Sequence, residues 1–151
     1  MLREAFNERL KTAMKARDSR TLSAVRLILA ALKERDVAAR TAGQAEPLAD
    51  SEILRLLQGM IKQRRESIAL YEKGNRADLV EQEAAEIAVI ESFLPKQMSD
   101  EETAAAVRAA IADTAAYGIK DMGKVMAALR ERHAGIIDLA RAGAVVKQQL
   151  S

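Results

Sequence analysis

Apolar residues recur at helical spacing along nearly the whole chain, and this periodicity restricts the folds that it can adopt. Leu2, Phe6, Leu10 and Met14 each lie four residues apart and form one apolar stripe on a first helix. The run from Leu22 to Leu32 is apolar on nearly every side, which predicts a central helix packed by several neighbours. Aromatic residues make up only 3% of the chain, and strong helix formers such as Ala, Leu, Glu, Lys and Arg dominate. We predict an all-α fold.

Capping and breaking residues separate the apolar runs. Lys73-Gly74-Asn75 is the clearest boundary, because Gly74 can supply a left-handed helix stop and Asn75 can cap the next helix. The other signals in this half are Asp18 or Ser19 before the second helix, Gly43 and Pro47 after it, and Asp50 or Ser51 before the third.

The segment Leu94-Pro95-Lys96-Gln97-Met98-Ser99 is the one convincing joint between domains. Proline disfavours helical geometry in the residue before it, so the fourth helix should end near Leu94. Ser99 with Glu102 three residues later fits the capping-box pattern and opens a fifth helix. The prediction is an N-terminal four-helix body over 1–94, a proline-containing hinge over 95–98, and a small three-helix C-terminal domain over 99–151.

Three shorter helices are expected after the hinge. Gly118 should end the fifth, Asp121 should cap the sixth, and Gly135 should stop it before a last helix from about Asp138 to Leu150. A unit of about fifty residues buries a low fraction of its surface, so its stability should be marginal.

Charge is distributed in blocks along the chain. Residues 1–40 carry ten basic and five acidic residues, 77–119 carry two basic and nine acidic, and 120–151 carry six basic and three acidic. Such blocks predict a polarised surface that could meet an anionic partner. The alternative is that these charges are ordinary solvated helix faces.

Several kinds of reactive centre are excluded by composition. The chain has no cysteine, so it has no disulfide, no thiolate zinc site and no cysteine nucleophile. Its single histidine, His133, follows Arg132 near an expected helix end and is interpreted as a surface residue. One histidine cannot form a His-rich metal site, and the acidic residues lack the spacing of a calcium loop. We expect no catalytic residue, no metal and no cofactor.

The segment from Gly118 to Val125 nearly matches the phosphate-binding G-x-x-x-x-G-K-[ST] loop. Val125, however, occupies the place of the hydroxyl that would bind magnesium, and a helix rather than a strand is expected before the segment. We interpret the match as chance.

The N-terminus has charges where a secretory signal would need an apolar run. The longest uninterrupted apolar stretch, Leu27 to Leu32, is far too short to span a bilayer. A cytoplasmic protein without a membrane segment is therefore expected.

Lys62-Gln63-Arg64-Arg65 is a local basic cluster in the third helix. It could contact phosphates, or Arg64 could pair with an acidic residue while the others are solvated. Stacking aromatics of the kind found in sequence-reading nucleic-acid modules are not evident, so any RNA contact should be to backbone and shape.

Five segments, in order over nearly the whole chain, carry a resemblance to known proteins: Arg17-Asp18 with 21–26, Lys62 to Ser67, Asn75 to Val80, Glu91 to Ser99, and Lys120 to Met126. Together they resemble the YqeY family, the free-standing relatives of the tail domain of GatB, a subunit of tRNA-dependent amidotransferases. The loop Gly135-Ile-Ile-Asp138-Leu139 departs from the Gly-Lys-Ala-Asp-Gly that relatives commonly show there.

The resemblance implies a two-part helical fold and a tail that helps to hold tRNA. It also implies a carbon–nitrogen ligase label with glutamine as amido-N-donor, although the chain shows neither a serine–lysine amidase signature nor a phosphate loop. The leading hypothesis is a non-catalytic tRNA-associated accessory protein. Its expected phosphate contacts are Lys120, Lys124, Arg130, Arg132 and Lys147 in the tail, with Lys62 and Arg65 in the body.

Two alternatives from other classes remain. One is an adaptor whose acidic face, over 77–102, binds a basic protein of the translation machinery, such as a synthetase or a ribosomal protein. The other, more distant, is a carbon–nitrogen ligase that acts alone with glutamine as amide donor.

Overall fold

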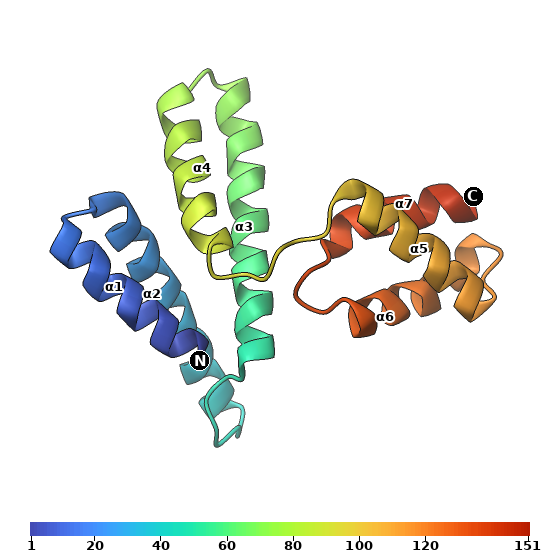
Figure 1. Cartoon of the computed structure of the whole chain (residues 1–151), viewed down its shortest axis with the longest axis horizontal. Coiled ribbons are helices and arrows are strands. Elements are labelled where there is room, and N and C mark those ends of the chain that lie inside the picture. The colour runs from blue at the N-terminus through green and yellow to red at the C-terminus, as the bar shows by residue number, and fades with distance from the viewer. The chain divides into compact units, whose positions relative to one another are not determined.

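The computed structural model describes residues 1–151 and contains seven α-helices and no strand, which confirms the all-α prediction (Figure 1). The chain forms two compact units, Met1–Leu94 and Pro95–Ser151, called here the body and the tail. The helices are α1 (Leu2–Ala16), α2 (Ser19–Thr41), α3 (Asp50–Lys73) and α4 (Ala77–Glu91) in the body, and α5 (Asp100–Thr114), α6 (Met122–Arg132) and α7 (Leu139–Leu150) in the tail, with a short 3₁₀ turn, η1 (Ile119–Asp121), before α6.

The body consists of two helical hairpins, α1 with α2 and α3 with α4 (Figure 1). One apolar core joins the two hairpins. Phe6, Ile28, Ile53 and Leu57 are fully buried in this core. Each such side chain stabilises the fold by about 1.5–3 kcal/mol relative to an exposed one. The helix α2 contacts all three other helices of the body, but Leu27 is 42% exposed. The prediction of a central helix packed by several neighbours is therefore confirmed, although one face of α2 still meets solvent.

An aromatic contact ties the first helix to the chain that follows α4. The rings of Phe6 and Phe93 meet edge to face with centroids 4.8 Å apart, and the Arg9 guanidinium lies 4.7 Å from the Phe93 ring centroid. Arg9 also donates to Ser92 Oγ at 3.0 Å. Edge-to-face rings and a guanidinium over a ring are both favourable arrangements, so this end of the body is closed by contacts from opposite ends of its sequence.

Arg3 and Asp36 fasten the loop between α2 and α3. Arg3 donates from both terminal nitrogens to the two Asp36 carboxylate oxygens, at 2.8 and 2.9 Å. The carbonyl of Leu48 accepts from Arg3 at 3.1 Å, and the Leu48 backbone N–H donates to Asp36 Oδ1 at 3.1 Å. The bond from Arg3, aided by that from the Leu48 N–H, holds the pKa of Asp36 below its ordinary value.

We expect Asp36→Asn to destabilise the body at neutral pH and to flatten its acid sensitivity. A lowered pKa in the folded state means that Asp36 contributes stability above its unfolded pKa, about 3.9, and loses it as the pH falls through the folded value. Urea unfolding should show the variant about 1–2 kcal/mol less stable at pH 7, with the gap to wild type closing below about pH 4. Asp100→Asn, at a largely exposed carboxylate, is the control. A gap independent of pH would contradict the assigned role.

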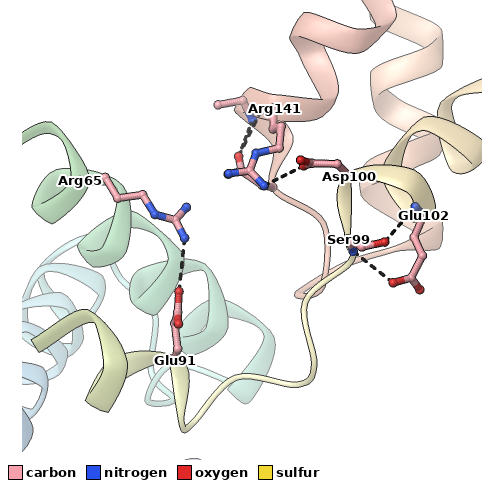
Figure 2. A network of polar contacts seen from close by, with 8 residues as sticks. Arg65, Glu91, Ser99, Asp100, Glu102 and Arg141 are labelled. Atoms are coloured by element: carbon pink, nitrogen blue, oxygen red, sulfur yellow. Dashed lines mark hydrogen bonds and ion pairs between the residues drawn. The ribbon is translucent and has the colours of Figure 1, made fainter. Parts of the chain in front are cut away.

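The tail packs its three helices around a separate apolar core. Val107, Val125, Leu129 and Val146 are fully buried there. The predicted capping box is confirmed: Ser99 Oγ accepts from the Glu102 backbone N–H, and the Glu102 carboxylate accepts from the Ser99 N–H, both at 3.1 Å (Figure 2).

Further hydrogen bonds hold the start of α7 in place. The side chain of Arg141 donates to the Asp100 carboxylate at 2.9 Å, linking the start of α7 to the start of α5 (Figure 2). Asp138 caps α7 by accepting from the Ala140 and Arg141 backbone N–H groups. Gly135 has φ 81°, as its predicted role as a helix stop requires.

Two predicted helix boundaries are wrong in detail. Gly74 has φ −86°, and Asn75, at φ 55°, takes the left-handed conformation after α3, so Asn75 does not cap α4. The helix α5 ends at Thr114, with Ala115 in the left-handed conformation at φ 54°, rather than continuing to Gly118. Asparagine tolerates the left-handed region, whereas alanine enters it at some cost in energy, so the alanine position could not be anticipated.

Candidate nucleic-acid interface

The five predicted phosphate-contacting residues of the tail are all exposed, and they belong to three elements. Lys120 lies in η1 and Lys147 lies in α7. The other three, which lie in α6, are Lys124, Arg130 and Arg132.

The turn that leads into α6 is organised by Asp121. Its carboxylate accepts from the Tyr117 backbone N–H at 3.1 Å and lies 3.6 Å from Lys124 Nζ, while its own N–H donates to the Gly118 carbonyl at 2.9 Å. The bond from Tyr117 is the main reason that the pKa of Asp121 lies below its ordinary value. Asp121 stands before α6 as predicted, but its carboxylate caps no N–H of that helix. It instead holds the turn and keeps Lys124 beside it.

An aromatic ring stands on the same turn. Tyr117 is 78% exposed, and Lys120 Nζ lies 5.1 Å from its ring centroid. This exposed ring was not singled out from the sequence. The signal was present in the sequence, because Tyr117 lies outside every apolar stripe, beside Gly118 and three residues before a lysine.

The far end of α6 differs from its start. Arg132 pairs with Asp113 on α5 at 2.7 Å, so its charge is partly neutralised within the tail. Arg130 and Lys147 are exposed and take part in none of the tail's ion pairs. Cations without an acidic partner are the ones best suited to meet an outside anion, because no internal pair has to be broken first.

Lys62 and Arg65, the predicted contacts of the body, lie on α3. Both are exposed, and Arg65 donates to Glu91 on α4 at 3.2 Å (Figure 2). Between them in sequence, Arg64 is 14% exposed and donates to Glu86 at 2.9 Å, with Glu83 at 3.9 Å. The prediction that Arg64 pairs with an acidic residue is confirmed, and Arg64 therefore acts in the packing of α3 against α4.

The acidic residues of α4 are matched by arginines of the body itself. Four arginines pair with five carboxylates: Arg76 with Asp78, Arg20 with Glu81, Arg64 with Glu83 and Glu86, and Arg65 with Glu91. A basic partner protein would have to compete with these pairs, so the acidic surface expected for an adaptor is largely neutralised over α4.

The remaining motifs take structural positions. Val125 is fully buried in the tail core, and the segment from Gly118 onward connects α5 to α6, not a strand to a helix. His133 is half-buried at the end of α6, where its backbone N–H donates to the Leu129 carbonyl at 3.0 Å. No group of three or more His, Cys, Asp or Glu side chains is placed to hold a metal ion. None of the helices combines the length and the apolar character needed to cross a membrane.

The structure is that of a small all-helical protein of two compact units, with basic side chains exposed on α6. The chain belongs to the YqeY-like protein family, whose model matches residues 3–150. It is 35% identical over 85 residues to "Altered inheritance of mitochondria protein 41, mitochondrial" of Lachancea thermotolerans, a match that covers 56% of this chain and 43% of the relative. The protein of the same name in Kluyveromyces lactis is 32% identical over 89 residues, 59% of this chain and 46% of the relative. The chain thus spans less than half the length of these relatives.

The predicted cytoplasmic location is wrong when set against these relatives. Proteins of Lachancea thermotolerans, Kluyveromyces lactis and Eremothecium gossypii that match the chain are all named as mitochondrial. The prediction rested on the lack of an apolar secretory signal, and that argument does not bear on mitochondrial import, for which targeting segments are basic and amphipathic rather than apolar.

Proposed function

We propose that the protein is a non-catalytic tRNA-associated accessory protein that binds RNA through the phosphate backbone. The observation that carries the proposal is the cationic surface of the tail, where Lys120, Arg130 and Lys147 are exposed without an acidic ion-pair partner. Lysine and arginine side chains so placed can replace the counterions of a nucleic acid. Lys124 and Arg132 add to this surface, but each would first have to give up an exposed ion pair, with Asp121 and Asp113 respectively.

The two-part organisation has a role in this proposal. We take 1–94 as the body, 95–98 as a hinge and 99–151 as the RNA-binding domain, with Lys62 and Arg65 as a second set of phosphate contacts on the body. A flexible connection would let both sets engage one RNA without new contacts between the units, which raises affinity through effective concentration. Because matched relatives are named as mitochondrial, a mitochondrial tRNA pool belongs in the assay beside total tRNA.

We expect binding to total tRNA to weaken steeply with salt and to be strongly reduced in the Lys120→Glu/Lys124→Glu double variant. Each phosphate contact contributes roughly 0.7–0.9 to the slope of log affinity against log salt, so losing two should lower that slope by about 1.5. Filter binding between about 50 and 200 mM salt measures both quantities.

The matched control is Lys11→Glu/Lys15→Glu, which makes the same charge change at the same spacing on exposed positions of α1. It should retain most of the affinity. Equal losses in the two double variants would mean that only net charge matters, and affinity that stays flat with salt would remove the proposed function.

Separate assays address the two alternatives. An adaptor should keep its protein partner in a pull-down after nuclease treatment, and a self-sufficient ligase should transfer amide from glutamine to mischarged tRNA. A positive result in either would replace the proposed function.

A further inference from the structure

Tyr117 is the one aromatic residue of the chain that the fold leaves in solvent. Phe6 and Phe93 pack against each other in the body, and Tyr71 is half-buried on α3. Tyr117 is 78% exposed, although burying an aromatic ring is among the larger stabilising contributions that a side chain can make. Folding therefore does not account for an aromatic residue at this position.

The structure nevertheless holds the Tyr117 backbone in place. Its N–H is bonded to the Asp121 carboxylate at 3.1 Å, which closes the turn between α5 and α6. Ile119, two residues after Tyr117 in the same turn, is 45% exposed. The Tyr117 ring thus projects from a defined turn and has an apolar neighbour. Because the backbone of the turn is already ordered, binding a ligand on the ring would cost little backbone entropy.

The electrostatic surroundings of the ring favour an anionic aromatic ligand. Lys120 Nζ lies 5.1 Å from the ring centroid, and Lys124 follows one helical turn later. The negative charge of Asp121 is already engaged by Lys124 and by the Tyr117 N–H. A nucleotide offers both groups that such a site can recognise: a base with a flat face and a phosphate close to it.

We propose that Tyr117 stacks on an unpaired base of the bound RNA while Lys120 contacts an adjoining phosphate. This inference rests on the proposed function and specifies which part of the RNA is recognised. That part is the single-stranded nucleotides, such as those of loops and ends. Stacking accepts any base, because every base has a π-face, so the site selects unpaired RNA and not a sequence. Bases inside a duplex are already stacked on each other and cannot reach the ring.

Replacing Tyr117 should lower affinity without altering salt dependence. Tyr117→Ala should weaken binding to total tRNA about tenfold, within the range of base stacking on an aromatic residue. The slope of log affinity against log salt should stay at the wild-type value, because no charge is removed. Tyr117→Phe keeps the π-face and should bind within about twofold of wild type. Lys120→Ala should instead reduce the slope by about 0.7–0.9.

A fluorescent variant tests stacking directly. The chain has no tryptophan, so Tyr117→Trp introduces a single indole that can be excited selectively. A single-stranded RNA of about ten nucleotides should quench its emission, and a duplex RNA of the same length should not. Quenching by both RNAs alike would overturn selection for unpaired bases. Circular dichroism of each variant should match wild type, because an exposed side chain contributes little to the core.

The failure of this inference and that of the proposed function are distinguishable. Salt-dependent binding by wild type, with Tyr117→Ala equal to it, would overturn the stacking role and leave the proposed function standing. A loss in Tyr117→Phe as large as that in Tyr117→Ala would also overturn stacking, since it would assign the effect to the hydroxyl. Absence of RNA binding by wild type would remove the proposed function and the stacking role together.

Discussion

Replacing Arg64 by methionine should lower the free energy of unfolding of the body by about 3 kcal/mol. The guanidinium lies between α3 and α4, 2.9 Å from Glu86 and 3.9 Å from Glu83, and the three side chains are 14%, 14% and 20% exposed. Methionine fills a similar volume but leaves two poorly solvated carboxylates without a cation. Breaking a partly buried pair from one side is expensive because the remaining charge has lost both water and partner.

The matched control for this prediction is Arg55→Met, the same substitution at an exposed position of the same helix. It should change the free energy of unfolding by no more than about 0.5 kcal/mol. Adding Glu83→Gln and Glu86→Gln to Arg64→Met should recover part of the loss, because the unpaired charges are then gone. Urea unfolding followed by circular dichroism measures all four proteins. Equal losses for Arg64→Met and Arg55→Met would show that the cluster contributes no more than surface charge does.

The second large effect is expected in the tail. Leu129 is fully buried between α6 and the other two tail helices, and Leu129→Ala should destabilise the tail by about 3 kcal/mol. A unit of this size has only a few kcal/mol of stability in total, so this loss should remove most of it and leave a substantial fraction of molecules with an unfolded tail. The body has its own core and should stay folded.

Hydrogen exchange resolved along the chain measures this effect. Amides of α5, α6 and α7 should lose protection in Leu129→Ala, while those of α2 and α3 keep theirs. Leu70→Ala is the matched control, because Leu70 is 67% exposed and its truncation leaves no cavity. A uniform loss of protection over all helices would show that body and tail unfold as one cooperative unit.

The features of this protein that can be predicted well from its sequence are those set by interactions between residues close in the chain. The capping box of Ser99 and Glu102 was predictable because both partners lie within one helical turn and their bonds need nothing else. The helical period likewise located all seven helices, since each turn places its own apolar stripe. The boundary at Ala115 was missed because alanine seldom adopts the left-handed conformation that it has there. The boundary at Asn75 was misassigned because asparagine is suited both to capping a helix and to this conformation.

For ion pairs between residues far apart in the sequence, the kind of partner could be predicted but not the particular residue. An acidic partner for Arg64 was expected, but Glu86 lies 22 residues away on another helix, and several carboxylates of α4 could have served equally. The exposed ring of Tyr117 was missed for a related reason. Its position outside every apolar stripe is a signal in the sequence, but the turn held by Asp121 is what shows that the ring remains in water.

The contact of Phe6 and Arg9 with Ser92 and Phe93 also sets an order of events during synthesis. The first helix leaves the ribosome early, yet the residues that close its end of the core follow more than eighty positions later. Until then Phe6 has no ring to meet, and the nascent body exposes an apolar surface to chaperones and to other chains. The tail closes over a much shorter stretch of sequence. The body should therefore complete its core more slowly than the tail, and it should be more prone to aggregation during translation.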